Sequence, residues 1–552
     1  MLHEFGRRTA FRGGNPYRAR AYTRAAENLL AVPEPLEALI TQNRLKEIPG
    51  VGHAIADIVT KLHETGGHPA LEAMRKEIPA GALELLEVPG LRPEKALKLH
   101  RELGISSLEE LEAAARADRL RPVKGLGAAL QKKILQGIAI TREAQGRRHI
   151  HRADVLLRAA AEQLGRSPSL TRITPAGDFR RGCELVRDLS IVAQTLGRKT
   201  PVVIERGGPT LAVHLADENH FGAALLMATG SEDHIEALRA LAKRRGYTLD
   251  ERGLRKGRKL IAGASEEEIY RALGLSFIPP ELREGRGEIE KALAGKLPVL
   301  VSDDDIRGIL HAHTDKSDGV DTLEAMTEAV RSRGYAYFGI ADHSQSAHYA
   351  GGLSLDEIAQ QHGAIDDLNR RYGKSFRVFK GIESDILADG SLDYPDDVLA
   401  KFDFVIASVH GRFKLDREEQ TTRILRAVEN PFTTILGHMT GRQLLRRPGY
   451  EVDIERILQA CAARNVAVEI NANPWRLDLD WRWHQRALEL GCMMSINPDA
   501  HSTDEIDLTH WGVQMARRGG VPPGRVLNCL TLPAFKSYLA AKRARRPTPH
   551  RS

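Results

Sequence analysis

The sequence is poor in cysteine and has no long apolar run. Its 552 residues contain four cysteines, Cys183, Cys461, Cys492 and Cys529, none in a CxxC spacing. They are too few for a disulfide framework, which fits a reducing compartment. No apolar stretch approaches the roughly 20 residues of a membrane span, and the polar, basic start is unlike a signal peptide. We therefore expect a cytoplasmic protein without membrane contact.

The composition is that of a globular protein with a basic balance. Apolar residues make up 42% and charged residues 28%, and the net charge is +7. At a loose prior of roughly 150 residues per domain, the length predicts three or four domains. Residues 1–150 hold 24 Lys and Arg against 18 Asp and Glu, which permits a polyanionic partner. The basic run from Lys542 to Arg546 is either a phosphate-binding tail or a solvated basic surface.

Three glycine turns in the first third each precede a helical pattern. They are Ile48-Pro-Gly50-Val-Gly52, Val88-Pro-Gly90-Leu91 and Val123-Lys-Gly125-Leu-Gly127. Glycines expose backbone N–H groups, and a helix start adds partial positive charge, so each turn can hold a phosphate oxygen without reading a base. The repetition on a basic segment predicts DNA binding by helix-hairpin-helix turns; ordinary helix connections are the alternative. The second copy has Arg92-Pro93 where the others have a second glycine, and a purely structural role is the alternative there.

Seven apolar runs after residue 305 each lead to a polar side chain that can bind a metal. Helical patterns fill most of the intervening segments, so the pattern predicts a parallel β/α barrel with its strand ends gathered on one face. The candidate metal ligands are His311, His313, Asp318, His343, Glu383, His410, His438, Asp499 and His501. A single histidine is as often a structural residue, but the complete set at strand ends indicates one site.

Nine ligands are too many for one metal ion. We expect two or three ions, with Glu383 or Asp499 as a bridge, and Mn²⁺ as the metal with Zn²⁺ and Fe²⁺ as alternatives. Such a site hydrolyses phosphoesters, and His311, His313, Glu383 and Asp499 are its expected catalytic residues.

Two arginines and four histidines stand apart from the candidate ligands. Arg442 and Arg476 follow the fifth and sixth runs, where they either bind the scissile phosphate or are surface residues. Histidines outside the ligand pattern are expected on the surface: His348, His362, His484 and His510.

The middle of the chain carries further motifs. They are Asn15-Pro-Tyr-Arg-Ala-Arg-Ala-Tyr22, Gly177-Asp-Phe-Arg-Arg-Gly182, Thr229-Gly-Ser231 and Ile278-Pro-Pro-Glu-Leu-Arg-Glu284. With the C-terminal ligands they resemble, over essentially the whole chain, a bacterial family X DNA polymerase fused to a polymerase-and-histidinol-phosphatase (PHP) domain. The resemblance implies nucleotide binding by Arg180, Arg181 and Gly182, and it assigns the same nine metal ligands. It also places Ile309 where the family generally has an aspartate that orients the following histidine.

The polymerase site departs from the family pattern. The resemblance implies three carboxylates that bind two Mg²⁺ ions, but the matching positions here are Asp188, Ser190 and His214. Serine carries no charge, and histidine suits a hard cation poorly. Met227 and Ala228 also replace the aromatic pair usual beside the incoming sugar. We therefore expect Asp188 to be a residual carboxylate, Mg²⁺ binding in the palm to be weak, and templated synthesis to be impaired or absent.

Together these patterns predict a multidomain α and α/β protein. We expect helical domains over 1–100 and 101–150, an α+β nucleotidyltransferase palm over 151–230, a thumb over 231–300, and a distorted (β/α)7 PHP barrel with a basic tail over 301–552. The predicted function is Mn²⁺-dependent 3′→5′ exonuclease activity of a bacterial, nucleoid-associated monomer on gapped, nicked or 3′-ended DNA. The resemblance adds abasic-site cleavage and 3′-phosphate removal in DNA repair. The alternatives are a working gap-filling polymerase with an editing PHP domain, and a non-catalytic DNA-end binder.

Overall fold

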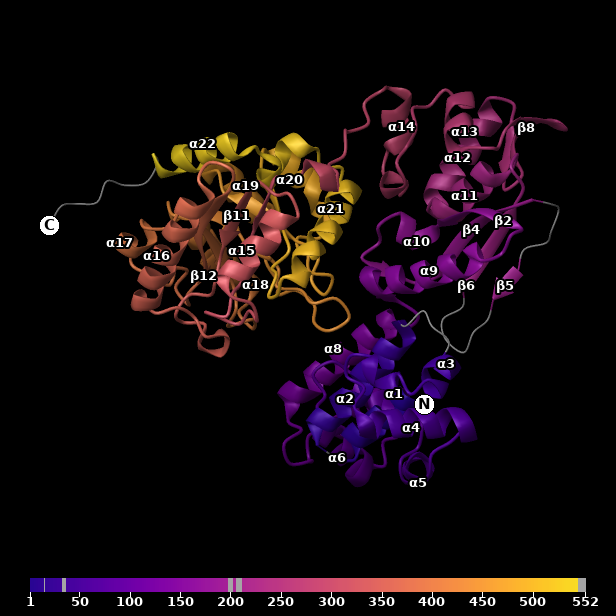
Figure 1. Ribbon diagram of the computed structural model, residues 1–552, viewed down its shortest axis with the longest axis horizontal. Coiled ribbons are helices and arrows are strands. Elements are labelled where there is room, and N and C mark those ends of the chain that lie inside the picture. Colours follow the sequence, from indigo (N-terminus) through magenta and orange to yellow (C-terminus); the bar gives the residue numbers. More distant parts are fainter. Residues whose placement is uncertain (14, 32–35, 197–201, 205–210, 545–552) are drawn as a thin grey trace. The chain divides into compact units, whose positions relative to one another are not determined.

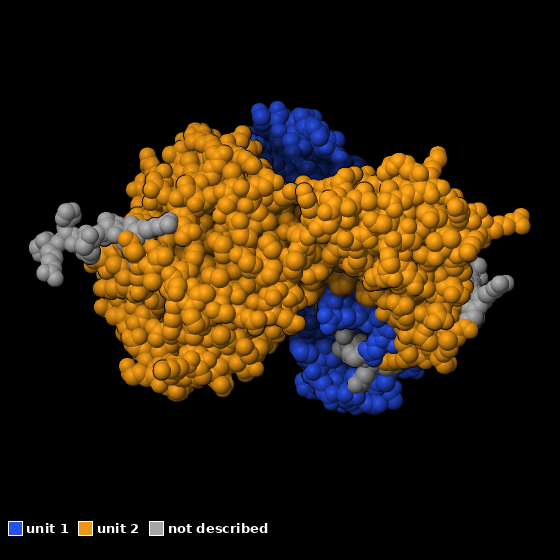
Figure 2. Space-filling view, turned by 90° about the horizontal axis from the view of Figure 1, so that it is seen from above, with its two compact units in different colours: residues 1–148, 154–163, 445–447 blue, residues 149–153, 164–444, 448–552 orange. Residues whose placement is uncertain are grey.

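The computed structural model describes residues 1–13, 15–31, 36–196, 202–204 and 211–544. The end of the basic tail, including Arg545 and Arg546, lies outside these residues. The chain divides into two compact units, drawn in different colours in Figure 2. Unit 1 comprises 1–148, 154–163 and 445–447, and unit 2 comprises 149–153, 164–444 and 448–552. Across the described ranges, no helix combines the length and apolar character that crossing a membrane requires.

Unit 1 is helical. Its helices are α1 (Leu2–Phe11), α2 (Pro16–Ala31), α3 (Leu36–Thr41), α4 (His53–Thr65), α5 (Pro69–Glu77), α6 (Pro93–Leu103), α7 (Leu108–Arg116) and α8 (Ala128–Ala144), with 3-10 turns η1 (Leu45–Glu47) and η2 (Gly81–Glu87). Capping chemistry sets several helix starts. Ser107 accepts a hydrogen bond from the backbone N–H of Glu110 at the start of α7, and Pro93 begins α6, where a missing N–H costs no helical bond.

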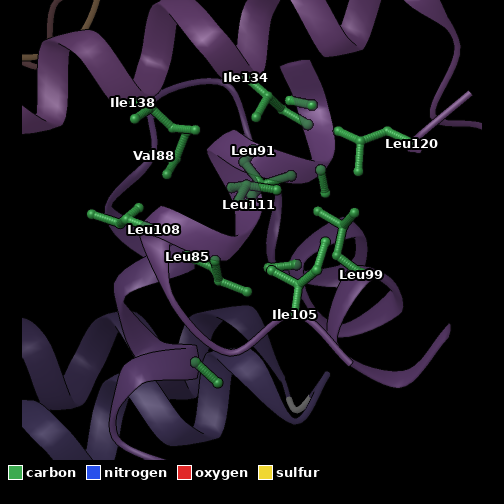
Figure 3. Close-up of a cluster of buried hydrophobic side chains, with 14 of the residues drawn as sticks. Leu85, Val88, Leu91, Leu99, Ile105, Leu108, Leu111, Leu120, Ile134 and Ile138 are labelled. Carbon is green, nitrogen blue, oxygen red and sulfur yellow. The ribbon is translucent and has the colours of Figure 1, made fainter. Parts of the chain in front are cut away.

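Two hydrophobic clusters form the core of unit 1. One draws on residues 2–74, and the other on Phe11 and residues 78–138. Figure 3 shows the second cluster, in which Val88 and Leu91 of the second glycine turn lie among leucines and isoleucines of neighbouring helices. The cores thus divide between Met74 and Ile78, earlier than the expected boundary at residue 100, because α6 packs with α7 and α8.

The three glycine turns share one backbone conformation. Gly50, Gly90 and Gly125 have φ values of 81°, 82° and 85°, in the left-handed region that favours glycine. Gly52 and Gly127 are the N-caps of α4 and α8. The second turn therefore has the same conformation at its first glycine as the other two, although Arg92 replaces the second glycine as N-cap of α6.

The palm is built on a four-stranded sheet with strand order β2-β4-β6-β5. Its strands are β2 (Leu170–Pro175), β4 (Leu189–Thr195), β5 (Val202–Ile204) and β6 (Leu211–Ala216); short strands β1 (Arg148–His149) and β3 (Leu185–Val186) and helices α9 (Ile150–Gly165), α10 (Gly177–Arg180) and α11 (Phe221–Thr229) complete the segment. Strands β4 and β6 run parallel, with Ser190 opposite Ala212.

The thumb follows directly after α11. It comprises α12 (Glu232–Arg244), β7 (Thr248–Asp250), β8 (Gly253–Lys256), β9 (Lys259–Ala262), α13 (Glu266–Ala272), η3 (Pro280–Leu282) and α14 (Glu288–Leu293). One apolar cluster runs from Ala223 in α11 to Ala292 in α14, so the last palm helix also packs into the thumb core.

The C-terminal segment is the expected barrel. Its strands are β10 (Gly308–Leu310), β11 (Tyr337–Ile340), β12 (Arg377–Asp385), β13 (Phe404–Ser408), β14 (Thr433–Leu436), β15 (Ala467–Asn471) and β16 (Met494–Asn497). They form one sheet in chain order, and every neighbouring pair is parallel. The prediction of seven strands in a β/α barrel is confirmed.

Helices surround the barrel strands in Figure 1. They are α15 (Leu323–Ser332), α16 (Leu355–Tyr372), α17 (Asp396–Leu399), α18 (Arg417–Glu429), α19 (Ile454–Arg464), α20 (His484–Leu490), α21 (Thr509–Arg518) and α22 (Leu532–Arg543). The 3-10 turns of this segment are η4 (Asp303–Asp305), η5 (His348–Ala350), η6 (Trp481–Trp483), η7 (Asp504–Leu508), η8 (Pro523–Arg525) and η9 (Leu527–Cys529). Most strand residues are buried, as expected where helices cover a parallel sheet.

The barrel closes beyond the ends of its first and last strands. Ala312 and Ala500 form a parallel bridge, in which the N–H of His313 donates to the carbonyl of Ala500 at 2.8 Å. Both bridging segments carry candidate metal ligands, so closure of the barrel itself brings the two ends of the ligand set together.

Candidate metal centre

All nine predicted ligands lie at the carboxyl ends of the barrel strands or in the loops that follow. Eight of them form three groups whose ligand atoms lie within 4.8 Å of one another. The groups are His313, Asp318, His343 and His501; His311, His313 and Asp499; and His343, Glu383 and His410. The ninth residue, His438, lies outside these groups but has its Nε2 3.0 Å from Glu383 Oε1.

Glu383 is the centre of the arrangement. Its carboxylate is 1% exposed, and five histidines approach it within 3.0–3.7 Å. His311 Nε2 and His438 Nε2 face Oε1 at 3.2 and 3.0 Å, whereas His343 Nδ1 faces Oε2 at 3.0 Å. A carboxylate with both oxygens facing imidazole nitrogens has the position required of a bridging ligand.

Three buried nitrogen and oxygen atoms of this cluster lie close to one another's side chains but form no hydrogen bonds. Within the described part of the chain, His311 Nε2, His343 Nδ1 and Glu383 Oε2 have no hydrogen-bond partner. Unpaired polar atoms in a buried site are costly unless something else satisfies them. Nitrogen and oxygen atoms that converge without bonding one another fit a shared cation, so the residues present fit a metal site of mixed imidazole and carboxylate ligands.

The carboxylates are held ionised by the surrounding histidines. Burial opposes ionisation of Glu383, but His410, His311 and His343 outweigh it and lower its pKa well below the ordinary range. Burial likewise opposes ionisation of Asp499, and His311 and His313 lower its pKa. Both carboxylates are therefore in the charged form that binds a cation.

The histidines differ from one another. Burial and the neighbouring His343 lower the pKa of His313 to about 4. Burial also disfavours charge on His410, but Glu383 and Asp385 outweigh it and raise its pKa to about 10. Removing protons from such histidines is linked to cation binding, because only the neutral imidazole is a ligand.

A second layer of acceptors orients three ligand histidines. Glu469, buried in β15, faces His311 Nδ1 at 2.5 Å, and Asp385 faces His410 Nδ1 at 2.5 Å. The backbone carbonyl of Asp499 faces His501 Nδ1 at 2.9 Å. An acceptor at Nδ1 keeps the proton there, so Nε2 would present its lone pair to a bound metal.

Ile309 has no hydrogen-bonding group in its side chain, and the buried carboxylate that faces His311 is that of Glu469. Its carboxylate also accepts hydrogen bonds from the backbone N–H of His438 at 2.6 Å and from Asn497 Nδ2 at 2.8 Å. Sequence reasoning did not single out Glu469. The signal was its position two residues before Asn471 on one strand, which puts both side chains on the same side.

Two ligands have left-handed backbone conformations. His311 has φ 62° and Asp499 has φ 52°, which is unfavourable for residues with a Cβ. Strain of this kind costs about 1–3 kcal/mol per residue and is concentrated at functional sites.

The two candidate phosphate-binding arginines have different surroundings. Arg442 donates to Asp480 at 2.7 Å, to the carbonyl of Arg476 at 3.0 Å and to the carbonyl of Leu477, so all its nitrogens are engaged in holding the loop after β15. Arg476 has its Nε 3.7 Å from Asp499 Oδ2, and its side chain is 20% exposed. Arg476 therefore lies at the mouth of the ligand cluster, and Arg442 fixes its loop.

Two histidines outside the ligand set depart from expectation. His362 is half-buried, and its ring packs against Phe402 with the centroids 4.9 Å apart. The prediction that His484 is a surface residue is wrong, because His484 is fully buried and its Nε2 contacts the carbonyl of Leu479 at 3.1 Å.

The palm lacks a comparable cluster. None of the three ligand groups found among the described residues lies in this segment. Asp188 and His214 are exposed, and Ser190 is buried. Ser190 contributes no charge beside Asp188, as the sequence indicated.

The two palm arginines are paired with carboxylates. Arg180 makes two bonds to Glu266, at 2.8 and 2.7 Å. Arg181 donates to Glu284 at 2.8 Å and to Asp178 at 2.6 Å. Gly182 has φ 69° and ends the turn after α10.

The fold and the site define a class of protein: a helical unit with helix-hairpin-helix turns, a palm and thumb, and a parallel barrel with clustered metal ligands. Family models match four segments: a helix-hairpin-helix domain at 1–68, a SAM-like helix-hairpin-helix tandem at 82–139, a DNA polymerase beta thumb at 224–284 and a PHP domain at 310–473. These matches confirm the architecture expected from the sequence.

Named relatives agree with this class. The chain is 34% identical, over 96% of each sequence, to a Bacillus subtilis (strain 168) protein named DNA polymerase/3′-5′ exonuclease PolX. It is 27% identical to a Thermoanaerobacter sp. (strain X514) protein named probable phosphatase, over 40% of this chain and 95% of that one. The chain belongs to the family X DNA polymerases that carry a C-terminal PHP domain. Its helix-hairpin-helix and thumb domains indicate DNA binding.

Proposed function

We propose that the PHP barrel hydrolyses DNA phosphodiesters as a metal-dependent 3′→5′ exonuclease, with Mn²⁺ as the preferred metal. Abasic-site cleavage and 3′-phosphate removal are companion reactions of the same site, carried out by a monomer on gapped, nicked or 3′-ended DNA. The observation that carries the proposal is the set of nine candidate ligands centred on Glu383, of which all but Asp318 are buried or half-buried. The exonuclease in the name of the Bacillus subtilis relative supports the same reaction.

The chain's own residues hold and orient the reactants. Glu383 and Asp499 supply anionic oxygens, and the histidines supply neutral nitrogens once their protons are released. Bound divalent metals would supply activation of the attacking water and neutralise the charge that grows on the phosphate. Arg476 is the cation beside the cluster that we assign to a non-bridging phosphate oxygen of the substrate.

We propose in addition that the palm synthesises DNA poorly or not at all. Two of three expected carboxylates are replaced by Ser190 and His214, and Asp188 alone cannot hold two Mg²⁺ ions. Arg180 and Arg181 are neutralised by internal carboxylates, which weakens their attraction for a triphosphate. The palm then serves to hold DNA, and the helix-hairpin-helix glycines Gly50, Gly52, Gly90, Gly125 and Gly127 present their N–H groups to its phosphates.

One experiment separates these proposals. Gapped DNA with a 5′-labelled primer is incubated with Mn²⁺, with and without dNTPs, using wild type, Asp188→Ala and His311→Ala. We expect shortening of the primer that is lost only in His311→Ala. Elemental analysis of the same preparations reports whether His311→Ala has lost bound metal.

The polymerase named in the Bacillus subtilis relative makes a working polymerase the second candidate. Lengthening of the primer that Asp188→Ala abolishes would favour it and overturn the proposal for the palm. Binding without any change in primer length, by all three proteins, would instead indicate a non-catalytic DNA-end binder. A double variant, Ser190→Asp with His214→Asp, tests the cause: if the missing carboxylates are the defect, it gains dNTP incorporation.

A further inference from the structure

An aromatic side chain stands at the mouth of the metal centre and is not among its ligands. Tyr349 lies in η5, in the loop between β11 and α16, and 69% of the residue is exposed. Its ring centroid is 6.1 Å from that of His343 and 6.3 Å from that of His410, with interplanar angles of 60° and 62°. The ring therefore lies beside two of the candidate ligand histidines while much of it stays open to solvent.

The loop that presents Tyr349 is anchored on both sides. Ser346 donates its backbone N–H to Asp393 at 2.7 Å, and its hydroxyl to Asp385 at 3.3 Å. Ala347 and Ala350 are buried, and the Ala350 N–H donates to the Ala347 carbonyl at 2.8 Å. The alanines thus supply the packing of the loop, and the aromatic ring between them is not needed for it.

The loop also returns close to its own start. A Cβ at Gly352 would lie 1.8 Å from the carbonyl oxygen of Ser344, so only glycine permits this approach. Gly351 has φ 66°, which again favours glycine. The backbone that carries Tyr349 is consequently restrained before any substrate arrives, which lowers the entropy cost of using its ring for binding.

We infer that Tyr349 stacks on the base of the terminal nucleotide whose phosphodiester the barrel hydrolyses. A nucleotide with its phosphate at the ligand cluster has its base one sugar away, at the rim where Tyr349 lies. Stacking on an aromatic ring accepts any base, which suits an enzyme that shortens DNA regardless of sequence. This inference rests on the proposed exonuclease function and adds how its substrate end is bound.

The test compares two substrates that differ only in the terminal base. One single-stranded DNA ends in an ordinary nucleotide, and the other ends in a tetrahydrofuran abasic residue. Wild type, Tyr349→Leu and Tyr349→Phe are assayed with Mn²⁺ for kcat and KM. We expect Tyr349→Leu to lose about tenfold or more in kcat/KM on the ordinary end, chiefly through KM, and to match wild type on the abasic end. Tyr349→Phe should retain most activity on both.

Tyr372→Leu is the matched control, because Tyr372 ends α16 near the start of β12, away from the ligand ends of the strands. A second measurement does not depend on turnover. DNA with a terminal 5-iodouracil and a hydrolysis-resistant phosphorothioate linkage is irradiated, and we expect the crosslink on Tyr349.

The outcomes distinguish the stacking role of Tyr349 from the proposed exonuclease function. If wild type hydrolyses neither substrate, the proposed exonuclease fails. If wild type is active but Tyr349→Leu loses equally on both ends or not at all, the stacking role is overturned.

Discussion

Replacing the buried carboxylate of Glu469 by an amide should weaken metal binding without removing a ligand. In Glu469→Gln the side chain keeps its shape, but one of its two oxygens becomes an NH₂ group. Oε1 faces His311 Nδ1 and Asn497 Nδ2, and Oε2 faces the backbone N–H of His438. In either orientation of the amide, its NH₂ group therefore faces a group that donates a hydrogen bond to Glu469 in the wild type.

The consequence for the metal site follows from the tautomer of His311. An NH₂ group facing Nδ1 favours the imidazole with its proton on Nε2, the nitrogen that faces Glu383 at 3.2 Å. The opposite orientation leaves the His438 N–H without an acceptor, at about 1–3 kcal/mol. Loss of such an orienting partner typically lowers metal affinity or activity 10- to 100-fold, or about 1.4–2.7 kcal/mol.

The assay is exonuclease activity on labelled DNA as a function of Mn²⁺ concentration. We expect the half-maximal Mn²⁺ concentration of Glu469→Gln to rise about 10- to 100-fold, with activity largely restored at saturating metal. Glu383→Gln, which removes a ligand, should not be rescued. Glu455→Gln is the control, since Glu455 forms an exposed ion pair with Arg486 on the outside of the barrel. An unchanged Mn²⁺ curve for Glu469→Gln would refute the reasoning.

Three further outcomes are expected. Arg476→Ala should lower kcat/KM about 100-fold, measured by steady-state kinetics, and leave the metal content unchanged, measured by elemental analysis. A kcat/KM equal to that of wild type would show that the substrate phosphate does not contact Arg476. Arg180→Leu should lower the free energy of unfolding by about 3 kcal/mol at pH 7. Burial opposes ionisation of Glu266, but Arg180 and Arg283 lower its pKa, so its contribution is present at neutral pH and lost in acid. Denaturant titrations should therefore show the deficit shrinking as pH falls, and a constant deficit would contradict this. Gly90→Ala should lower the free energy of unfolding by about 1 kcal/mol and weaken gapped-DNA binding in a fluorescence assay. Unchanged DNA binding would show that the second turn makes no phosphate contact.

The sequence alone predicted the barrel and the polar side chains at its strand ends, because both leave local marks. A buried parallel strand reads as an apolar run, and the residue at its carboxyl end is known from order alone. His311, His343 and His438 could therefore be assigned to one site without any coordinates. Glycine turns are equally local, and the φ of 82° at Gly90 belongs to the short motif in which the residue lies.

Only the tertiary structure decided which polar groups face one another. Glu469 and His311 are 158 residues apart in the sequence. Arg442 donates its hydrogen bonds to backbone carbonyls and to Asp480, so none is left for a substrate. His484, expected at the surface, is buried because its ring lies against Gly519, just after α21. Hydrogen-bond partners depend on distances of a few tenths of an ångström between segments remote in sequence, and residue order does not encode these distances locally.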